Sequence, residues 1–309
     1  MSPILSKTNT VSQSGGRPQV AVEIALKGAL AAAIPAPGQP PVYAFSALSE
    51  GAIIPGIGEP NIRKPEAVAE AIRSALDQVS PRTRNVTLVL PDTAARVFVL
   101  DFDSLPAKAA EAVPVLRFRL RKMVPFDVEH AALSYQLLVH EKLQGHGAVK
   151  VLVTLMPGPI LAEYESVVRA AGYEPGAVLP SSLAALAAFD SMEPILAANL
   201  NDQALTTSIT SGQDLLLYRT VELPEDGPAR IAEVQRSIAV AAAYFEDKLL
   251  APPHELHYAG SIGAAEFASL IGDAGLSVVD MAPRPETGAA TSLGTISLAG
   301  IAGALAGAV

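Results

Sequence analysis

The chain has 309 residues, half of them hydrophobic and 17% charged, so it is long enough for two domains and too apolar to be wholly disordered. Acidic residues outnumber basic ones 31 to 22, and the resulting net charge of −9 argues against a nucleic-acid partner. Because the sequence has no Cys, disulfides, thiolate catalysis and Cys-ligated metal sites are excluded.

Residues 1–18 are polar and rich in Ser, Thr and Gly, and they lack the apolar run of about 7–15 residues that a signal peptide needs. We interpret them as a disordered leader and expect a cytoplasmic protein.

The next part of the chain predicts alternating strands and helices. Apolar alternation over residues 20–24 predicts a strand, and a turn at Lys27 and Gly28 leads to a second strand or a short helix. Further strands are expected at residues 42–45, 85–90, 96–102, 133–139, 149–155 and 177–179, and helices at 64–79, 107–123, 158–172 and 181–189. Pro114 predicts a kink in the second helix or its division into two.

From about residue 191 the pattern restarts. Strands are expected at residues 195–200, 205–211, 215–221, 255–259 and 276–279, and helices at 229–250 and 264–274. Residues 287–309 carry no charge, but only six of these 23 are Leu, Ile or Val. We therefore favour a buried strand and a tightly packed Ala/Gly helix here over a membrane anchor, which remains the alternative.

This order of elements predicts an α/β protein with mixed sheets flanked by helices. The first domain is expected at residues 19–190, with an inserted α/β subdomain at about 84–172, and the second domain at 191–309.

Several motifs carry a family resemblance. Their runs are Val89–Asp92, Arg96–Val99, Arg121–Asp127 with its Lys-x-Val-Pro-Phe sequence, Tyr135–Leu138, Tyr164–Pro175 and Glu233–Ser237. Together with the final Ala/Gly helix, they resemble the type IV pilus assembly protein PilM family over about residues 19–309. The resemblance implies an actin-like (ribonuclease H-like) two-domain fold related to the cell-division protein FtsA. It also implies a cytoplasmic adaptor that binds the N-terminal tail of an inner-membrane PilN-like protein.

The resemblance also places a nucleotide site, whose motifs have changed in this chain. In the first hairpin, Glu23 stands where the family has Asp, and Ala25 stands where it has Gly. Lys27 and Gly28 follow in the same run, but the hydroxyl residue and the Lys of the family's motif are missing from their positions. The altered second hairpin and the nucleoside motif comprise Asn199, Asn201, Thr206, Gly260 and Ser261.

We therefore expect weak or absent ATP binding, no catalytic residues and no required cofactor, with Mg–ATP as an open possibility. The alternatives are an active actin-like ATPase whose nucleotide state regulates partner binding and, less favoured, a sugar-kinase-like phosphotransferase. Glu23 could equally be an ordinary polar residue on a strand.

A basic and apolar group near the second helix is the candidate partner-binding site. It comprises Arg117, Phe118, Leu120, Arg121, Pro125 and Phe126. The cations could instead form a solvated helix face, or dock near anionic lipids, and the apolar residues could simply be core. The five His residues show no metal-ligand spacing, so no metal site is expected.

Overall fold

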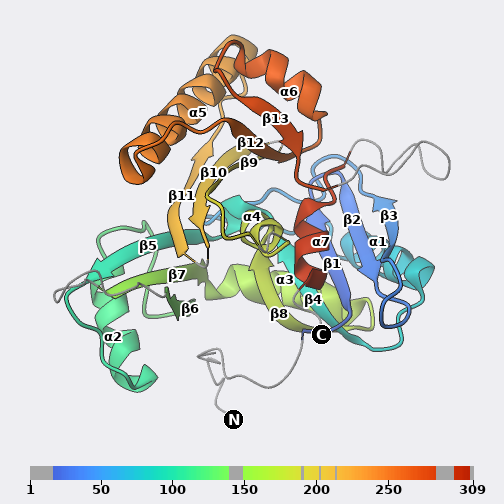
Figure 1. The fold of residues 1–309 in the computed structure, drawn as a ribbon. Helices are drawn as coiled ribbons and strands as arrows, with labels where there is room; N and C mark the ends of the chain where they lie inside the picture. The colour runs from blue at the N-terminus through green and yellow to red at the C-terminus, as the bar shows by residue number, and fades with distance from the viewer. Residues whose placement is uncertain are drawn as a thin grey trace.

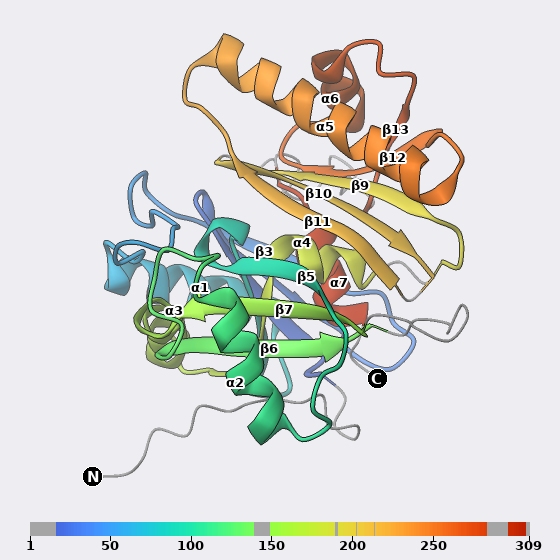
Figure 2. The same cartoon turned by 90° about the vertical axis from the view of Figure 1, so that its left-hand side faces the viewer.

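Three β-sheets organise the computed structural model, which describes residues 17–138, 149–188, 191–201, 203–212, 214–282 and 296–306. Two sheets have five strands each and the third has three. Figures 1 and 2 show the two larger sheets in separate lobes, with the smaller sheet beside the first. We call these units the first lobe, the second lobe and the insertion.

The first lobe is built on a sheet of order β3-β2-β1-β4-β8. Its strands are β1 (Val20–Ala25), β2 (Gly28–Ala33), β3 (Val42–Ala47), β4 (Asn85–Leu90) and β8 (Glu174–Pro180). The predicted alternation is confirmed, because Val20, Val22 and Ile24 pack into one core while Ala21 packs into the core on the opposite face. The Ala-rich residues 28–33 form a strand because they pair with β1 on one side and β3 on the other.

Helices cover both faces of this sheet. They are α1 (Pro65–Val79), α3 (Gly158–Ala170), α4 (Ser181–Leu186) and the 3₁₀ turn η1 (Asp92–Ala94). In α1, Val68, Ile72 and Leu76 form a fully buried stripe against the sheet, as their spacing predicts.

The second lobe repeats this plan, with a sheet of order β11-β10-β9-β12-β13. Its elements are β9 (Ile195–Leu200), β10 (Ala204–Ser211), β11 (Asp214–Glu222), α5 (Gly227–Leu249), β12 (Glu255–Gly260), α6 (Ala264–Ile271) and β13 (Ser277–Asp280). In each lobe the first three strands are antiparallel neighbours, and the last two run parallel to the first. The lobes therefore share one topology, as the restart of the pattern suggests.

The insertion contains β5 (Arg96–Phe102), α2 (Ala109–Leu120), β6 (Ala131–Leu137) and β7 (Val149–Pro157), with sheet order β5-β7-β6. Its sheet spans a narrower range than the expected 84–172, because β4 and β8 pair within the first lobe. α2 is one helix rather than two. Proline has no backbone N–H, so Pro114 cannot donate to the carbonyl oxygen of Ala110, four residues earlier. Both residues are exposed, so water can donate to that oxygen instead.

The last described helix, α7 (Ala299–Ala306), returns to the first lobe and packs on α4, β1 and β2 (Figure 1). It is buried and Ala/Gly-rich, as expected. The strand expected before it belongs to the charge-free run that begins at residue 287, and residues 287–295 lie outside the described residues. Residues 1–16 of the expected leader and residues 139–148 lie outside them too. No helix in the described ranges is long and apolar enough to cross a membrane.

Candidate functional site

A small cleft lies where the two lobes meet. The predicted nucleotide-site residues that line it are Glu23, Ala25, Lys27, Gly28, Asn199, Asn201, Gly260 and Ser261. They come from the β1–β2 hairpin, the β9–β10 turn and the end of β12, so the tertiary structure brings together three segments that are far apart in sequence. Thr206 is the exception, since it lies outside this lining.

Glu23 lies on β1 with its carboxyl group enclosed by other parts of the first lobe. Ser181 donates a hydrogen bond to Oε1 at 2.7 Å, and Gly300 of α7 approaches so closely that an added Cβ would lie 2.8 Å from Oε2. Burial raises the pKa of Glu23 to about 7, although the Ser181 hydrogen bond opposes this. A half-protonated carboxyl group is a poor ligand for Mg²⁺, which prefers charged oxygen donors.

The glycines of the cleft are explained by packing. A Cβ on Gly28 would lie 2.3 Å from the Ser46 carbonyl oxygen, and one on Gly260 would lie 2.8 Å from the Leu200 carbonyl oxygen. Both residues are therefore needed for strand contacts whether or not a phosphate binds.

The two asparagines of the second hairpin are engaged within the protein. The Asn199 amide donates to Ser182 Oγ at 2.9 Å. The Asn201 side-chain oxygen accepts from the backbone N–H groups of Gln203 and Ala204, at 2.9 and 2.7 Å, which closes the β9–β10 turn. Neither residue supplies a negative charge, and Glu23 and Lys27 are the only charged side chains in the described lining.

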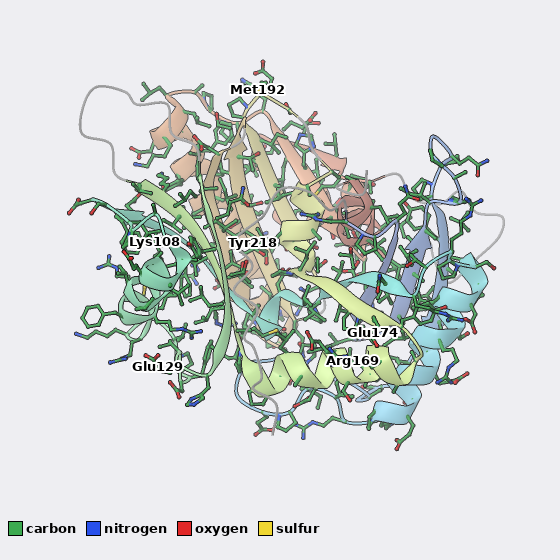
Figure 3. The ribbon with its side chains drawn as sticks, turned by 90° about the horizontal axis from the view of Figure 1, so that it is seen from below. Lys108, Glu129, Arg169, Glu174, Met192 and Tyr218 are labelled. Atoms are coloured by element: carbon green, nitrogen blue, oxygen red, sulfur yellow. The ribbon has the colours of Figure 1, made fainter. Side chains whose placement is uncertain are left out.

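Next to the cleft is a buried polar network, which the sequence analysis missed. Asp92, in η1, accepts hydrogen bonds from Ser182 N at 3.0 Å, Ser182 Oγ at 2.6 Å and Tyr218 Oη at 3.1 Å. Burial raises the pKa of Asp92, although its hydrogen bonds, including one with Thr206, oppose this. Figure 3 shows Tyr218 near the centre of the molecule, where the units meet. An acid two residues after the strand 85–90 is a signal that could have indicated this position.

The Ser181 hydroxyl donates to the Glu23 carboxyl group, so these two polar groups of the first lobe are engaged with each other. Within the described ranges, no three His, Asp or Glu side chains gather in a way that could hold a metal ion.

The six predicted partner-binding residues lie in and just after α2, but they are not one exposed surface. Leu120 is fully buried in the core of the insertion and Phe126 is half-buried against the same core, which corrects the expectation that Leu120 is accessible. Arg117 donates to the Ala131 carbonyl oxygen at 3.1 Å, and Arg121 pairs with Glu129 at 2.8 Å. Phe118 and Pro125 are exposed. In Figure 3, Lys108 and Glu129 mark this part of the molecule.

Strand β6, beside these residues, is an edge strand that pairs with β7 alone. The backbone N–H of Leu138, just beyond β6, donates to the carbonyl oxygen of Lys150 on β7. Because backbone groups alternate in direction along an antiparallel strand, those of Leu133, Tyr135 and Leu137 point away from β7. Among the described residues, the outward backbone groups of these three have no partner. The Leu137 side chain is also 52% exposed.

Comparisons with known proteins show which solved structures share this fold. The chain matches no protein-family model and no curated protein sequence. It is similar in structure to a chain of the PilM-PilN type IV pilus biogenesis complex, with a TM-score of 0.71, 18% identity, and coverage of 96% of this chain and 100% of that one. It also matches the cytoplasmic domain of EpsL, an inner-membrane component of the type II secretion system of Vibrio cholerae. That match has a TM-score of 0.48 and 14% identity and covers 77% of this chain and 81% of that one.

A Bacteroides thetaiotaomicron protein with an actin-like ATPase fold gives a TM-score of 0.48 at 10% identity, covering 93% of this chain and 95% of that one. The likeness to the PilM-PilN structure extends over both lobes and the insertion. The chain therefore has the α/β actin-like fold, in an arrangement similar along its whole length to that of the pilus biogenesis complex.

Proposed function

We propose that this protein is an actin-like adaptor of a type IV pilus or related secretion machine. In this proposal it works at the cytoplasmic face of an inner membrane and binds the extended tail of a PilN-like membrane protein. The likeness to the PilM-PilN structure supports the kind of partner. The observation that carries the proposal is the open edge of β6, because a peptide in extended conformation can add to such an edge as a further strand.

The edge offers both affinity and selectivity to a peptide. Backbone groups at Leu133, Tyr135 and Leu137 would form the ladder, and the exposed Leu137 side chain would contact apolar residues of the tail. Pro125 and the half-buried Phe126 lie in the segment between α2 and β6, and they would form the border of the peptide site on the insertion.

A proline substitution tests this pairing. The Leu137 N–H points away from β7, so Leu137→Pro removes an outward donor without breaking a bond of the native ladder. We expect the affinity for a fluorescent tail peptide, measured by anisotropy, to fall about tenfold or more. Leu137→Ala, which keeps the N–H, should weaken binding less.

A peptide methylated on alternate backbone nitrogens provides the matched control. Methylation in one register should abolish binding, and methylation in the other should leave it nearly intact, because only alternate amides of an added strand face β6. Equal effects in both registers, with circular dichroism showing every variant folded, would contradict strand addition.

We further propose that the cleft binds Mg–ATP weakly or not at all and does not hydrolyse it. Supporting this, Glu23 is enclosed by Ser181 and α7, Asn199 is bonded to Ser182, and Asn201 closes its own turn. The alternative, an active ATPase, is favoured only by the gathering of the predicted residues around one cleft.

Titration calorimetry with Mg–ATP separates these alternatives. The parent chain should show no binding at micromolar nucleotide, and the triple variant Ala25→Gly, Asn199→Asp, Asn201→Gly should gain affinity by restoring the carboxylate and the space for phosphate. Micromolar binding with turnover by the parent chain would establish the ATPase alternative.

A further inference from the structure

We propose that the outer face of α2 is a docking surface for an anionic lipid membrane. The outer face comprises Val115, Phe118, Arg119 and Lys122, spaced i, i+3, i+4 and i+7 along α2 and the turn that ends it. The inference rests on the proposed function for the cellular setting, but its test needs no protein partner.

α2 has two different faces. Ala112, Leu116 and Leu120 are fully buried against the sheet of the insertion, whereas all four residues of the outer face are exposed. Figure 2 shows α2 lying over this sheet on the outside of the molecule. Because its residues are exposed, the outer face is accessible to a flat lipid surface.

The exposed apolar side chains are the first reason to infer a lipid partner. Phe118 is 76% exposed and Val115 is 38% exposed, and Met123, directly after the outer face, is 43% exposed. An aromatic side chain projecting from a helix between cations is typical of segments that lie at the boundary of lipid headgroups and acyl chains. The stems of the neighbouring cations would lie along the apolar region while their charges stay among the headgroups.

The charge pattern is the second reason. The chain as a whole has a net charge of −9. The two nearby acids are in ion pairs, however: Glu111 pairs with Lys108 at 3.9 Å, and Glu129 pairs with Arg121 at 2.8 Å. Asp127, beside His130, lies at the rim. Arg119 and Lys122 have no ion pair among the described residues, so the outer face offers an excess of positive charge to anionic headgroups.

The position of the outer face fits the proposed partner site. The Arg117 guanidinium, on the other flank of α2, reaches the Ala131 carbonyl oxygen at the start of β6, so α2 itself lies beside the edge strand. A membrane under α2 would thus lie close to the edge strand, where the tail of a membrane protein would arrive.

Vesicle flotation with the full chain tests the inference. We expect binding to vesicles of phosphatidylcholine with 30% phosphatidylglycerol (about a third anionic lipid) and none to phosphatidylcholine alone. Raising the salt from about 0.05 to 0.5 M should release the protein. Phe118→Ser and the double variant Arg119→Glu, Lys122→Glu should each lower the partition coefficient about tenfold.

Matched controls exclude general effects of polarity and charge. Met192→Ser removes a side chain of similar exposure, 79%, from a loop far from α2 (Figure 3), and Arg82→Glu, Lys248→Glu makes the same change in charge elsewhere. Both should bind vesicles as the parent does. Absence of binding to anionic vesicles, or equal losses in the controls and the α2 variants, would overturn the inference.

The tail-peptide assay separates this inference from the proposed function. The double variant Arg119→Glu, Lys122→Glu should bind the tail peptide normally, and Leu137→Pro should bind vesicles normally. Loss of one activity in both variants, with folding confirmed by circular dichroism, would show that the two surfaces are not distinct.

Discussion

Glu23 shows how a single buried acid changes what the cleft can do. Its carboxyl group receives a hydrogen bond from Ser181 and lies beside the first turn of α7. The same position, open to water, would carry a full negative charge at neutral pH. Enclosure instead raises its pKa to about 7, so between about pH 4.5 and 7 the folded state holds a proton that the unfolded state has released.

This pKa predicts a pH dependence of stability. Because the pKa of Glu23 is raised in the folded state from 4.5 to about 7, the folded state binds more protons over that window, and the free energy of unfolding falls as the pH rises through it. The loss from this group is about 3 kcal/mol. Urea denaturation of Glu23→Gln at pH 4 to 8 should show a flatter curve than the parent. Parallel curves would show that Glu23 titrates normally.

At the scale of elements, α7 depends on the absence of side chains where it crosses α4. A Cβ on Gly303 would lie 1.9 Å from the Ala184 carbonyl oxygen, far inside van der Waals contact. The small residues that made a membrane helix an alternative in sequence therefore serve a close helix–helix contact inside the first lobe.

Gly303→Ala should lower the free energy of unfolding by about 2–4 kcal/mol, because backbone atoms of α4 must move to admit the methyl group. Gly227→Ala is the matched control, since an added Cβ there meets nothing within 4 Å. Its effect should stay within about 0.5 kcal/mol in the same guanidinium titration. Similar losses in the two variants would show that α7 is not tightly packed on α4.

At the scale of the whole molecule, the network around Asp92 joins the units. Tyr218 on β11 of the second lobe donates to Asp92, which follows β4 of the first lobe, and Arg96 of the insertion pairs with Glu222 of β11 at 3.2 Å. The exposed ion pair contributes little, so the buried hydroxyl–carboxyl contact is the stronger connection.

Tyr218→Phe should cost about 1–3 kcal/mol in the free energy of unfolding, because the buried Asp92 loses a donor. Hydrogen exchange should rise at the amides of both η1 and β11, which a purely local effect would not produce. Tyr43→Phe is the control, since the Tyr43 hydroxyl has no hydrogen bond among the described residues. Unchanged exchange at η1 in Tyr218→Phe would show that this contact does not hold the lobes together.

Local patterns in the sequence determined most of the elements and their order. The alternation over residues 20–24, the apolar stripe of 64–79 and the restart near 191 each depend on neighbours along the chain, and each element formed as expected. Sequence motifs also indicated the actin-like fold, and they indicated which residues surround the cleft.

Only the tertiary structure decided the rest, because it depends on contacts between distant segments. No local pattern shows that β6 lies at a sheet edge, that Leu120 faces the core or that α7 returns to the first lobe. The environment of Glu23 is set by Ser181 and Gly300, which lie more than 150 residues away in sequence. Burial and hydrogen bonding are properties of the assembled fold, and they control whether such a group is a charged ligand or a neutral part of the core.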